Sequence, residues 1–214
     1  FYICESLTTV TLPDSLTTIG DNAFDRCRSL TTITLPEGLT SIGANPFSSC
    51  DSLAKIDVSP DHPEFEQIDG VLYEKATKTL ICYPAGKAGD TFAVPEGILA
   101  IGDYAFYGCD ALTTVTLPDS LTSIGDGAFY RCSSLTTATL PEGLTSIGDY
   151  AFSYCESLTT VTLPDSLISI GDYAFWNSPS DLTLTVPQDS YALQYAIDNG
   201  LAYTYPDAND WLNA

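Results

Sequence analysis

A repeat of 23 residues constrains the fold of this chain more than any other feature. Phe residues mark the period in two runs with a constant step: Phe1, Phe24 and Phe47, then Phe106, Phe129, Phe152 and Phe175. Each lies in a unit of the form S-L-T-T-V-T-L-P-[D/E]-[S/G]-L-T-S-I-G-D-x-A-F-x-x-C. A short fixed period is typical of a solenoid, in which each unit is one coil and stacked coils bury each other's apolar faces.

The order of residues within one unit predicts a short strand. Val10 and Leu12 would face the core, whereas Thr9 and Thr11 would face outward because side chains alternate along a strand. Pro13 would end the strand, since it has no backbone N–H to donate. We therefore expect one short parallel strand per coil, on the concave face of a curved superhelix.

The second half of the unit is predicted to turn the chain back into the core. Gly20 would allow a sharp bend. Asp21 would cap a single helical turn that carries Phe24 and Cys27. Each coil would then contribute about six inward apolar groups, each worth roughly 1.5 to 3 kcal/mol when buried.

The repeated units closely resemble the BspA-like leucine-rich repeats of bacterial surface proteins, as in "LPDSLTTIGDNAF", "LPEGLTSIG", "VPEGILAIGDYAFYGC" and "LPEGLTSIGDYAFSYC". The resemblance covers nearly the whole chain. It implies a right-handed leucine-rich-repeat solenoid that is displayed on a cell surface or secreted and is used for binding. It implies no particular ligand, because members of the family differ.

Two segments depart from the repeat. Residues 59–90 are predicted to form an inserted β-hairpin, with strands at 71–74 and 79–83 around the turn "KATK". Residues 189–205 are expected to cap the open end with a helix of about ten residues and a strand. Asp189 or Ser190 would start that helix and Gly200 would end it. We thus expect one structural domain: repeats at 1–58, the insertion, repeats at 91–188, the cap, and a tail at 206–214.

Charge limits the classes of partner. The chain has 28 acidic and 7 basic residues, a formal net charge of −21. This argues against nucleic acid and anionic membranes, which need basic patches. No apolar run approaches the roughly 20 residues that span a bilayer, and we expect a monomer. Phe1 falls inside a repeat with no Met before it, so we expect the natural N-terminus to lie upstream.

Residues that could support catalysis are few. His62 is the only histidine, and its setting in "PDHP" predicts an ordinary exposed loop residue. Cys82 is predicted to be the most reactive thiol because it falls outside the repeat. We expect no enzymatic activity, cofactor or metal. The remaining cysteines recur once per coil with no C-x-x-C pair, and we interpret them as buried hydrophobes in preference to disulfides or metal ligands: Cys4, Cys27, Cys50, Cys109, Cys132 and Cys155.

Acidic residues also recur at fixed positions. Stacked carboxylates repel one another, which divalent cations could relieve. Since no known calcium-loop pattern is present, we expect a solvated face in preference to specific calcium sites. One series of acids directly follows the repeat prolines: Asp14, Glu37, Glu96, Asp119, Glu142 and Asp165. A second series directly follows the repeat glycines: Asp21, Asp103, Asp126, Asp149 and Asp172.

Three surfaces are candidates for binding, each with a structural alternative. Threonine ladders would line the concave face as good strand formers or as hydrogen-bonding contacts: Thr9, Thr11, Thr32, Thr34, Thr114, Thr116, Thr137, Thr139, Thr160 and Thr162. Lysines in and beside the hairpin would contact a ligand or only protect its edge from pairing: Lys55, Lys75, Lys78 and Lys87. Aromatic residues beside the buried Phe would line one edge, as anchors for a ligand or as packing between coils: Tyr104, Tyr107, Tyr130, Tyr150, Tyr154, Tyr173 and Trp176.

These features predict a non-catalytic binding protein at a cell surface, adhesin-like, whose partner is an extracellular protein of a host or neighbouring cell. Two alternatives stay open. The aromatic edge would suit a carbohydrate-recognition module, in which rings stack on sugars. A solenoid that binds nothing would serve as a structural spacer in a larger surface protein.

Overall fold

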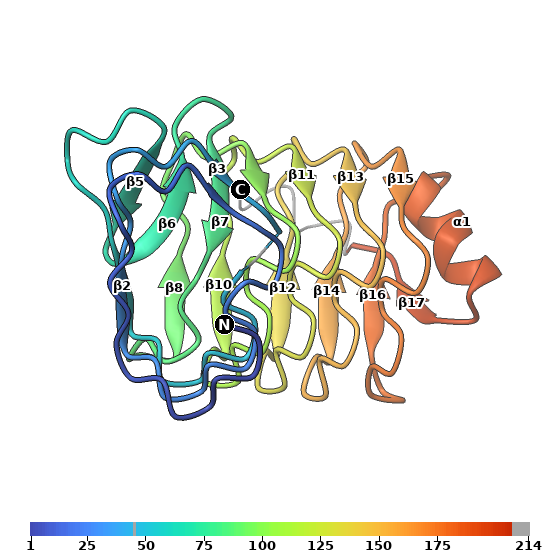
Figure 1. Cartoon of the computed structure of the whole chain (residues 1–214). Coiled ribbons are helices and arrows are strands. Elements are labelled where there is room, and N and C mark those ends of the chain that lie inside the picture. The colour runs from blue at the N-terminus through green and yellow to red at the C-terminus, as the bar shows by residue number, and fades with distance from the viewer. Residues whose placement is uncertain (45, 207–214) are drawn as a thin grey trace.

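The computed structural model describes residues 1–44 and 46–206, and these form a parallel β-solenoid (Figure 1). The predicted repeat solenoid is confirmed, with equivalent residues of neighbouring coils paired 23 positions apart, as in Thr137 with Thr160. The expected tail at 206–214 lies outside the described residues from residue 207 onward.

One sheet is formed by the threonine strands of the C-terminal coils, and we call it the threonine sheet. In the four inner strands of this sheet the middle residue points into the core, as Val161 does, and its neighbours face outward. In the two outer strands the middle residues are half-buried Phe92 and exposed Tyr203. The sheet has six strands, in the order β17-β16-β14-β12-β10-β8. Their bounds are β8 (Thr91–Ala93), β10 (Thr114–Thr116), β12 (Thr137–Thr139), β14 (Thr160–Thr162), β16 (Thr183–Thr185) and β17 (Ala202–Thr204).

A second short strand occurs in most coils, so the prediction of one strand per coil is corrected. These two-residue strands were missed because alternation cannot be recognised over two residues. They pair in parallel and in register, as Ile124 does with Ile147. The strands are β9 (Ala100–Ile101), β11 (Ser123–Ile124), β13 (Ser146–Ile147) and β15 (Ser169–Ile170).

The Gly-Asp dipeptide after each second strand links neighbouring coils. Asp126 Oδ1 accepts a hydrogen bond from the backbone N–H of Asp149 at 2.8 Å. In the same way Asp21 Oδ1 accepts from the N–H of Ala44, and the predicted cap of a helical turn is therefore wrong. A Cβ atom on Gly148 would lie 2.4 Å from Asp126 Oδ1. Most of these glycines are thus needed for close approach of the coils, which a bend alone does not explain.

Residues 1–58 form a separate group of coils, which we call the N-terminal stack. Its strands pair as β1 (Thr18–Ile19) with β3 (Ser41–Ile42), and β2 (Thr32–Thr34) with β4 (Lys55–Asp57). The strand expected at Thr9 and Thr11 is not formed. In the described chain this segment has a neighbouring coil on one side only, and Val10 stays half-buried.

The insertion contains three strands, where two were predicted. These are β5 (Phe65–Ile68), β6 (Val71–Glu74) and β7 (Thr79–Cys82), which pair in antiparallel order. Strand β7 also pairs in parallel with β9, and this joins the insertion to the sheet of two-residue strands. The missed strand β5 is joined to β6 by Asp69 and Gly70, both with positive φ. An Asp-Gly pair of this kind is a strong hairpin signal that the sequence already contained.

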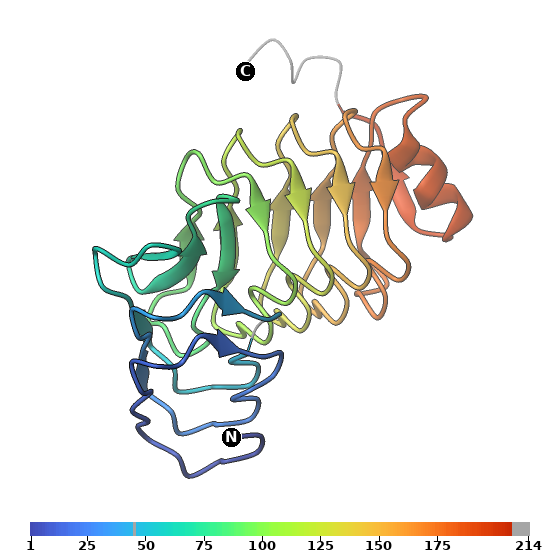
Figure 2. The same ribbon diagram turned by 45° about the horizontal axis from the view of Figure 1, so that its top comes forward.

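The insertion separates two hydrophobic cores. Leu72 and Cys82 pack into the core of the N-terminal stack. Tyr73 and Leu80 pack into the core of the coils that follow, which we call the C-terminal stack (residues 91–186). Within β6, strand alternation sends the neighbouring side chains of Leu72 and Tyr73 to opposite cores. The N-terminal coils are turned at an angle to the C-terminal stack, with the hairpin strands at the corner (Figure 2).

The predicted helix-strand cap is confirmed at the other end of the C-terminal stack (Figure 1). Helix α1 (Tyr191–Asp198) begins after Ser190, whose Oγ accepts a hydrogen bond from the N–H of Leu193 at 3.1 Å. Gly200 follows the helix with φ of +64°. Strand β17 then adds the last strand to the threonine sheet.

Candidate functional site

The predicted threonine ladders are divided between two sheets. Thr32 and Thr34 lie in the N-terminal stack, whereas Thr114 and Thr137 belong to the threonine sheet. The outer face is hollowed in both places, by cavities of about 770 Å³ beside β2 and about 260 Å³ between β10 and β12. Other threonines tie the coils together, as Thr136 Oγ1 donates to the carbonyl of Thr113 at 3.1 Å. Part of the threonine content is therefore structural.

The lysines near the hairpin mostly serve partners within the chain. Lys55 pairs with Asp57 at 2.8 Å, and Lys87 pairs with Asp69 at 2.8 Å. Lys75 Nζ donates to the carbonyl of His62 at 2.6 Å. Lys78 is exposed in the β6–β7 turn, and within the described part of the chain it makes no ion pair. The structure therefore does not gather these four side chains into one cationic patch.

His62 is fully buried, and the prediction of an exposed loop residue is wrong. Its Nδ1 accepts hydrogen bonds from the N–H groups of Glu64 and Phe65, at 3.2 and 3.1 Å. The other ring nitrogen, Nε2, therefore carries the proton and donates to the carbonyl of Pro36 at 3.2 Å. The ring satisfies the backbone of a tight turn, and the flanking prolines in "PDHP" were the signal of that turn.

Cys82 is also buried, which contradicts its predicted reactivity. Burial raises the pKa of its thiol, and the nearby Cys50 adds to the effect. The repeated cysteines are free and, apart from the half-buried Cys4, buried as predicted. Their thiols donate to the preceding coil, as Cys132 Sγ does to the carbonyl of Phe106 at 3.1 Å. We call this series the cysteine column.

The predicted aromatic residues form rows of rings in contact, which we call the aromatic edge. One row runs from Tyr107 through Tyr130 and Tyr154 to Trp176, with centroid separations of 5.6, 5.3 and 5.1 Å. Tyr150 stacks on Tyr173 in a second row, at 5.3 Å. The two rows meet where Tyr173 lies 6.4 Å from Trp176.

A guanidinium group completes the first row. The Cζ atom of Arg131 lies 5.7 Å from the ring centroid of Tyr130 and 5.6 Å from that of Tyr154. Both distances are within the range of cation–π attraction, which favours a cation over the face of an aromatic ring.

Several of these tyrosines occupy strained backbone positions. Tyr104, Tyr150, Tyr154 and Tyr173 have φ between 54° and 58°. A side chain larger than glycine costs about 1 to 2 kcal/mol in this left-handed region. Asn22 has the position of Tyr104 in the N-terminal stack, and Asn tolerates this conformation better. The solenoid can therefore be built without tyrosine at this position.

A crease lies where the two stacks meet, with a cavity of about 410 Å³. Arg28 and Asp51 line it from the N-terminal stack, and Tyr107 and Arg131 from the C-terminal stack. The pKa of Asp51 is raised above its usual value, mainly because the carboxyl group is partly buried. Arg28, 3.7 Å away, offsets part of this increase, and the charge of Asp110 adds to it. The aromatic edge therefore begins at this junction.

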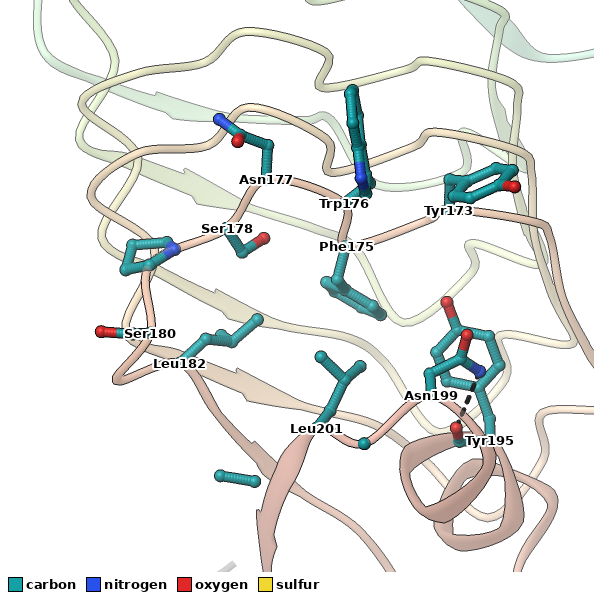
Figure 3. A pocket seen from close by; sticks show the side chains of 13 residues that line it. Tyr173, Phe175, Trp176, Asn177, Ser178, Ser180, Leu182, Tyr195, Asn199 and Leu201 are labelled. Atoms are coloured by element: carbon teal, nitrogen blue, oxygen red, sulfur yellow. Dashed lines mark hydrogen bonds between the residues drawn. The ribbon is translucent and has the colours of Figure 1, made fainter.

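A second cavity lies at the other end of the aromatic edge, and we call it the cap pocket. It has a volume of about 330 Å³. One wall comes from the turn that contains Tyr173, Trp176 and Ser178, and the other from Asn199 and Leu201 after α1 (Figure 3). The Nδ2 group of Asn199 donates to the carbonyl of Tyr195 at 2.9 Å. No sequence pattern predicted this pocket, because the capping segment was interpreted only as a cover for the core.

No helix among residues 1–44 and 46–206 is long and apolar enough to cross a membrane. The same residues contain no group of three or more His, Cys, Asp and Glu side chains placed to hold a metal ion.

Comparison with known proteins gives a consistent result. The family model for the BspA type leucine rich repeat region matches residues 1–79 and 86–199, in 6 copies. No curated protein matches the chain. Among solved structures, a leucine rich cell surface protein from Faecalibacterium prausnitzii is 33% identical with a TM-score of 0.67. The alignment covers 92% of this chain and 58% of that one.

Two other solved structures are similar. The pneumococcal vaccine antigen PcpA is 27% identical with a TM-score of 0.75, over 85% of this chain and 51% of that one. A leucine-rich repeat protein from Bacteroides capillosus is 30% identical with a TM-score of 0.52, over 58% of this chain and 99% of that one. The chain thus spans little more than half the length of the pneumococcal and Faecalibacterium proteins.

Proposed function

Because the chain belongs to the BspA-type leucine-rich repeat family, whose members are cell-surface proteins, we propose that it is a non-catalytic binding module of a bacterial surface protein. It contacts an extracellular protein of a host or neighbouring cell through the aromatic edge, as a monomer. The observation that carries this proposal is the row of rings from Tyr107 to Trp176, with Arg131 between two of them.

The chemistry of this row suits a protein contact. Tyr, Trp and Arg are the residues most enriched among those that dominate binding energy at protein interfaces. Rings already packed against their neighbours lose little conformational entropy on binding. Tyr173 and Trp176 remain about half exposed, at 55% and 50%, so their faces are available to a partner.

The backbone supports the same interpretation. Strained residues persist where the surrounding structure holds them, and they gather at functional sites. Tyrosine at positions with φ near 55° is a costly choice for the fold, since Asn22 and Gly127 occupy equivalent positions. The gain must therefore come from what the rings do.

The negative charge near the aromatic edge favours a partner with a basic surface. The exposed carboxylates of Asp103 and Asp149 directly precede Tyr104 and Tyr150 in the chain, within a protein of net charge −21. A partner with a basic patch would be attracted to this edge and would associate faster at low salt. Lys55, Lys75 and Lys87 are engaged within the chain, so the hairpin is a weaker candidate.

The experiment is binding of the purified chain to a panel of immobilised extracellular proteins, at low and physiological salt. Tyr130→Ala and Tyr154→Ala should each weaken binding to the protein that is captured by at least about thirtyfold, the effect of a dominant interface residue. Thr137→Ala on the threonine sheet is the matched control, with Lys78→Ala for the hairpin. Binding that survives both tyrosine changes but is lost with Thr137→Ala or Lys78→Ala would refute the aromatic edge as the contact.

A further inference from the structure

We propose that the cap pocket binds a neutral sugar residue, at a site distinct from the protein contact on the aromatic edge. The pocket takes its rim from Tyr173 and Trp176, but its polar groups come from the last coil and the segment after α1 (Figure 3). The proposal does not rest on the proposed protein partner.

The cysteine column changes identity at this pocket. In the preceding coils a thiol three residues after each Phe donates to the coil before, as Cys155 Sγ does to the carbonyl of Phe129 at 3.2 Å. Ser178 takes this place after Phe175. Its Oγ is buried and has no hydrogen-bond partner among the described residues, although the residue lines the cavity.

An unpaired buried hydroxyl is unfavourable, by roughly 1 to 3 kcal/mol. A cysteine or alanine would avoid this cost, and the other coils contain cysteine at this place. The hydroxyl of Ser178 therefore serves the fold poorly but would serve a ligand, to which it can both donate and accept a hydrogen bond.

The other polar groups match a sugar. The Nδ2 group of Asn199 is held by the carbonyl of Tyr195, which orients the amide and leaves Oδ1 as an acceptor. Asn177 adds an exposed amide at the rim. Hydroxyl groups of a sugar can bond to these amides and to Ser178, while its C–H faces pack against Trp176 and Tyr173.

The lining distinguishes a sugar from other ligands. None of the residues that line the pocket is Asp, Glu, Lys or Arg, although the chain contains 35 such residues, 28 acidic and 7 basic. A charged ligand would find no counter-charge. An apolar or aromatic side chain of a peptide would fill the floor at Phe175 and Leu182, but it would leave the amide and hydroxyl groups unpaired.

The size of the cavity agrees with a small ligand. Its volume of about 330 Å³ lies at the lower end of the range for small-molecule sites, roughly 300 to 1,000 Å³. The site therefore suits one terminal residue of a glycan, with the remainder of the glycan continuing into solvent.

The test is binding of the full chain to immobilised neutral oligosaccharides built from hexoses and N-acetylhexosamines, with sialylated and sulfated oligosaccharides beside them. At least one neutral oligosaccharide should bind, and its free terminal monosaccharide should compete. Trp176→Ala should reduce that binding at least tenfold. Tyr107→Ala, at the far end of the aromatic edge, is the matched control and should leave it unchanged.

Ser178→Ala separates a binding role from a structural one. Because the hydroxyl has no partner in the fold, this variant should be at least as stable as the original chain, yet bind the oligosaccharide several-fold more weakly. Ser178→Cys, which restores the column, should bind as weakly as Ser178→Ala. The proposal is overturned if no neutral oligosaccharide binds, if charged ones bind better, or if Ser178→Ala binds normally.

The two proposals fail independently. Tyr130→Ala should weaken capture of the extracellular protein without affecting binding of the neutral oligosaccharide, and Ser178→Ala should weaken binding of the oligosaccharide without affecting capture of the protein. Loss of both activities in Ser178→Ala, without loss of stability, would mean that the pocket belongs to the protein contact, and it would refute a separate sugar site.

Discussion

The N-terminal and C-terminal stacks are built from the same repeat but differ at one edge. Where the C-terminal stack has Tyr104 and Tyr150, the N-terminal stack has Asn22, with the same left-handed backbone. Both stacks form paired coils, so the scaffold does not require the rings. A repeat protein thus contains its own control, because residues that differ between equivalent positions are those not fixed by the fold.

The first coil of the chain differs from the C-terminal stack in how completely its Phe ring is buried. The Phe rings of the C-terminal stack form a continuous series from Phe106 to Phe175, with centroids 4.8 to 5.4 Å apart. In the N-terminal stack Phe1 lies on Phe24 at 5.1 Å but is 60% exposed. We therefore expect stability to be unevenly distributed, with the middle of the C-terminal stack the most resistant to opening.

Thiol reactivity should show the largest difference between the first coil and the C-terminal stack. Burial raises the pKa of Cys155 to about 12, which lowers its thiolate fraction at mildly alkaline pH by roughly three orders of magnitude. Cys4 is half-buried at the N-terminal end. A thiol reagent should therefore modify Cys4 at least a thousandfold faster than Cys155, as followed by peptide mass spectrometry.

Denaturation is the control for that measurement. In denaturant both thiols should react at similar rates, since burial is lost. Equal rates in the native chain would show that the C-terminal stack opens as readily as the N-terminal end, and the proposed difference in stability would be wrong.

Removal of single rings should give the next largest effect. Phe129 lies between Phe106 and Phe152 and is almost fully buried. Phe129→Ala should lower the free energy of unfolding by about 3 to 5 kcal/mol, because it leaves a cavity in the core. Phe1→Ala should cost about 1 kcal/mol, the value of one exposed aromatic pair. Denaturant titration of both variants checks this, and similar losses would contradict it.

The repeat made these rings predictable from the sequence, and the same repeat explains what was missed. The 23-residue period and the alternation of polar and apolar residues predicted the core and the aromatic edge, because both recur in successive coils. The cap was predictable because it begins where the repeat stops. His62 and β5 lie in the insertion, which occurs once, so no period indicated the burial of His62 or the presence of β5. The cap pocket arises where the column changes from Cys155 to Ser178, a single exception that a repeat pattern hides.

Because neighbouring coils approach each other closely, glycine should be required after the second strand of an interior coil. In the first coil of the chain it should be replaceable. On Gly148 a Cβ atom would lie 2.4 Å from Asp126 Oδ1 and 2.6 Å from the backbone carbon of Gly125. Gly148→Ala should therefore cost about 1 to 3 kcal/mol of unfolding free energy, as overpacking does. A Cβ atom on Gly20 would have no atom from beyond its chain neighbours within 4 Å, and Gly20→Ala should change stability by about 0.5 kcal/mol or less.

Thermal unfolding of this matched pair measures the difference. If Gly20→Ala is as damaging as Gly148→Ala, the glycines are needed for the bend of the chain, and contact between coils is not the cause. If neither variant is destabilised, the coils are less tightly stacked than the Asp126–Asp149 hydrogen bond indicates.

The smallest expected effect concerns the residue between the two stacks. Tyr73 is fully buried in β6, and its hydroxyl has no hydrogen-bond partner among the described residues. Burial raises its pKa, with Asp69 and Glu66 adding to the effect, so the hydroxyl stays protonated at neutral pH. Tyr73→Phe keeps the ring and removes only the unpaired group.

We therefore expect Tyr73→Phe to leave stability unchanged or to raise it by about 1 kcal/mol, with the gain shared by both stacks. Denaturant titration gives the total, and amide hydrogen exchange of Ile56 and Ile101 reports the N-terminal and C-terminal stacks separately. A loss above about 1 kcal/mol would mean that the hydroxyl is satisfied by buried water. A loss of stability confined to one stack would further mean that Tyr73 stabilises that stack alone. The two stacks would then unfold as independent units.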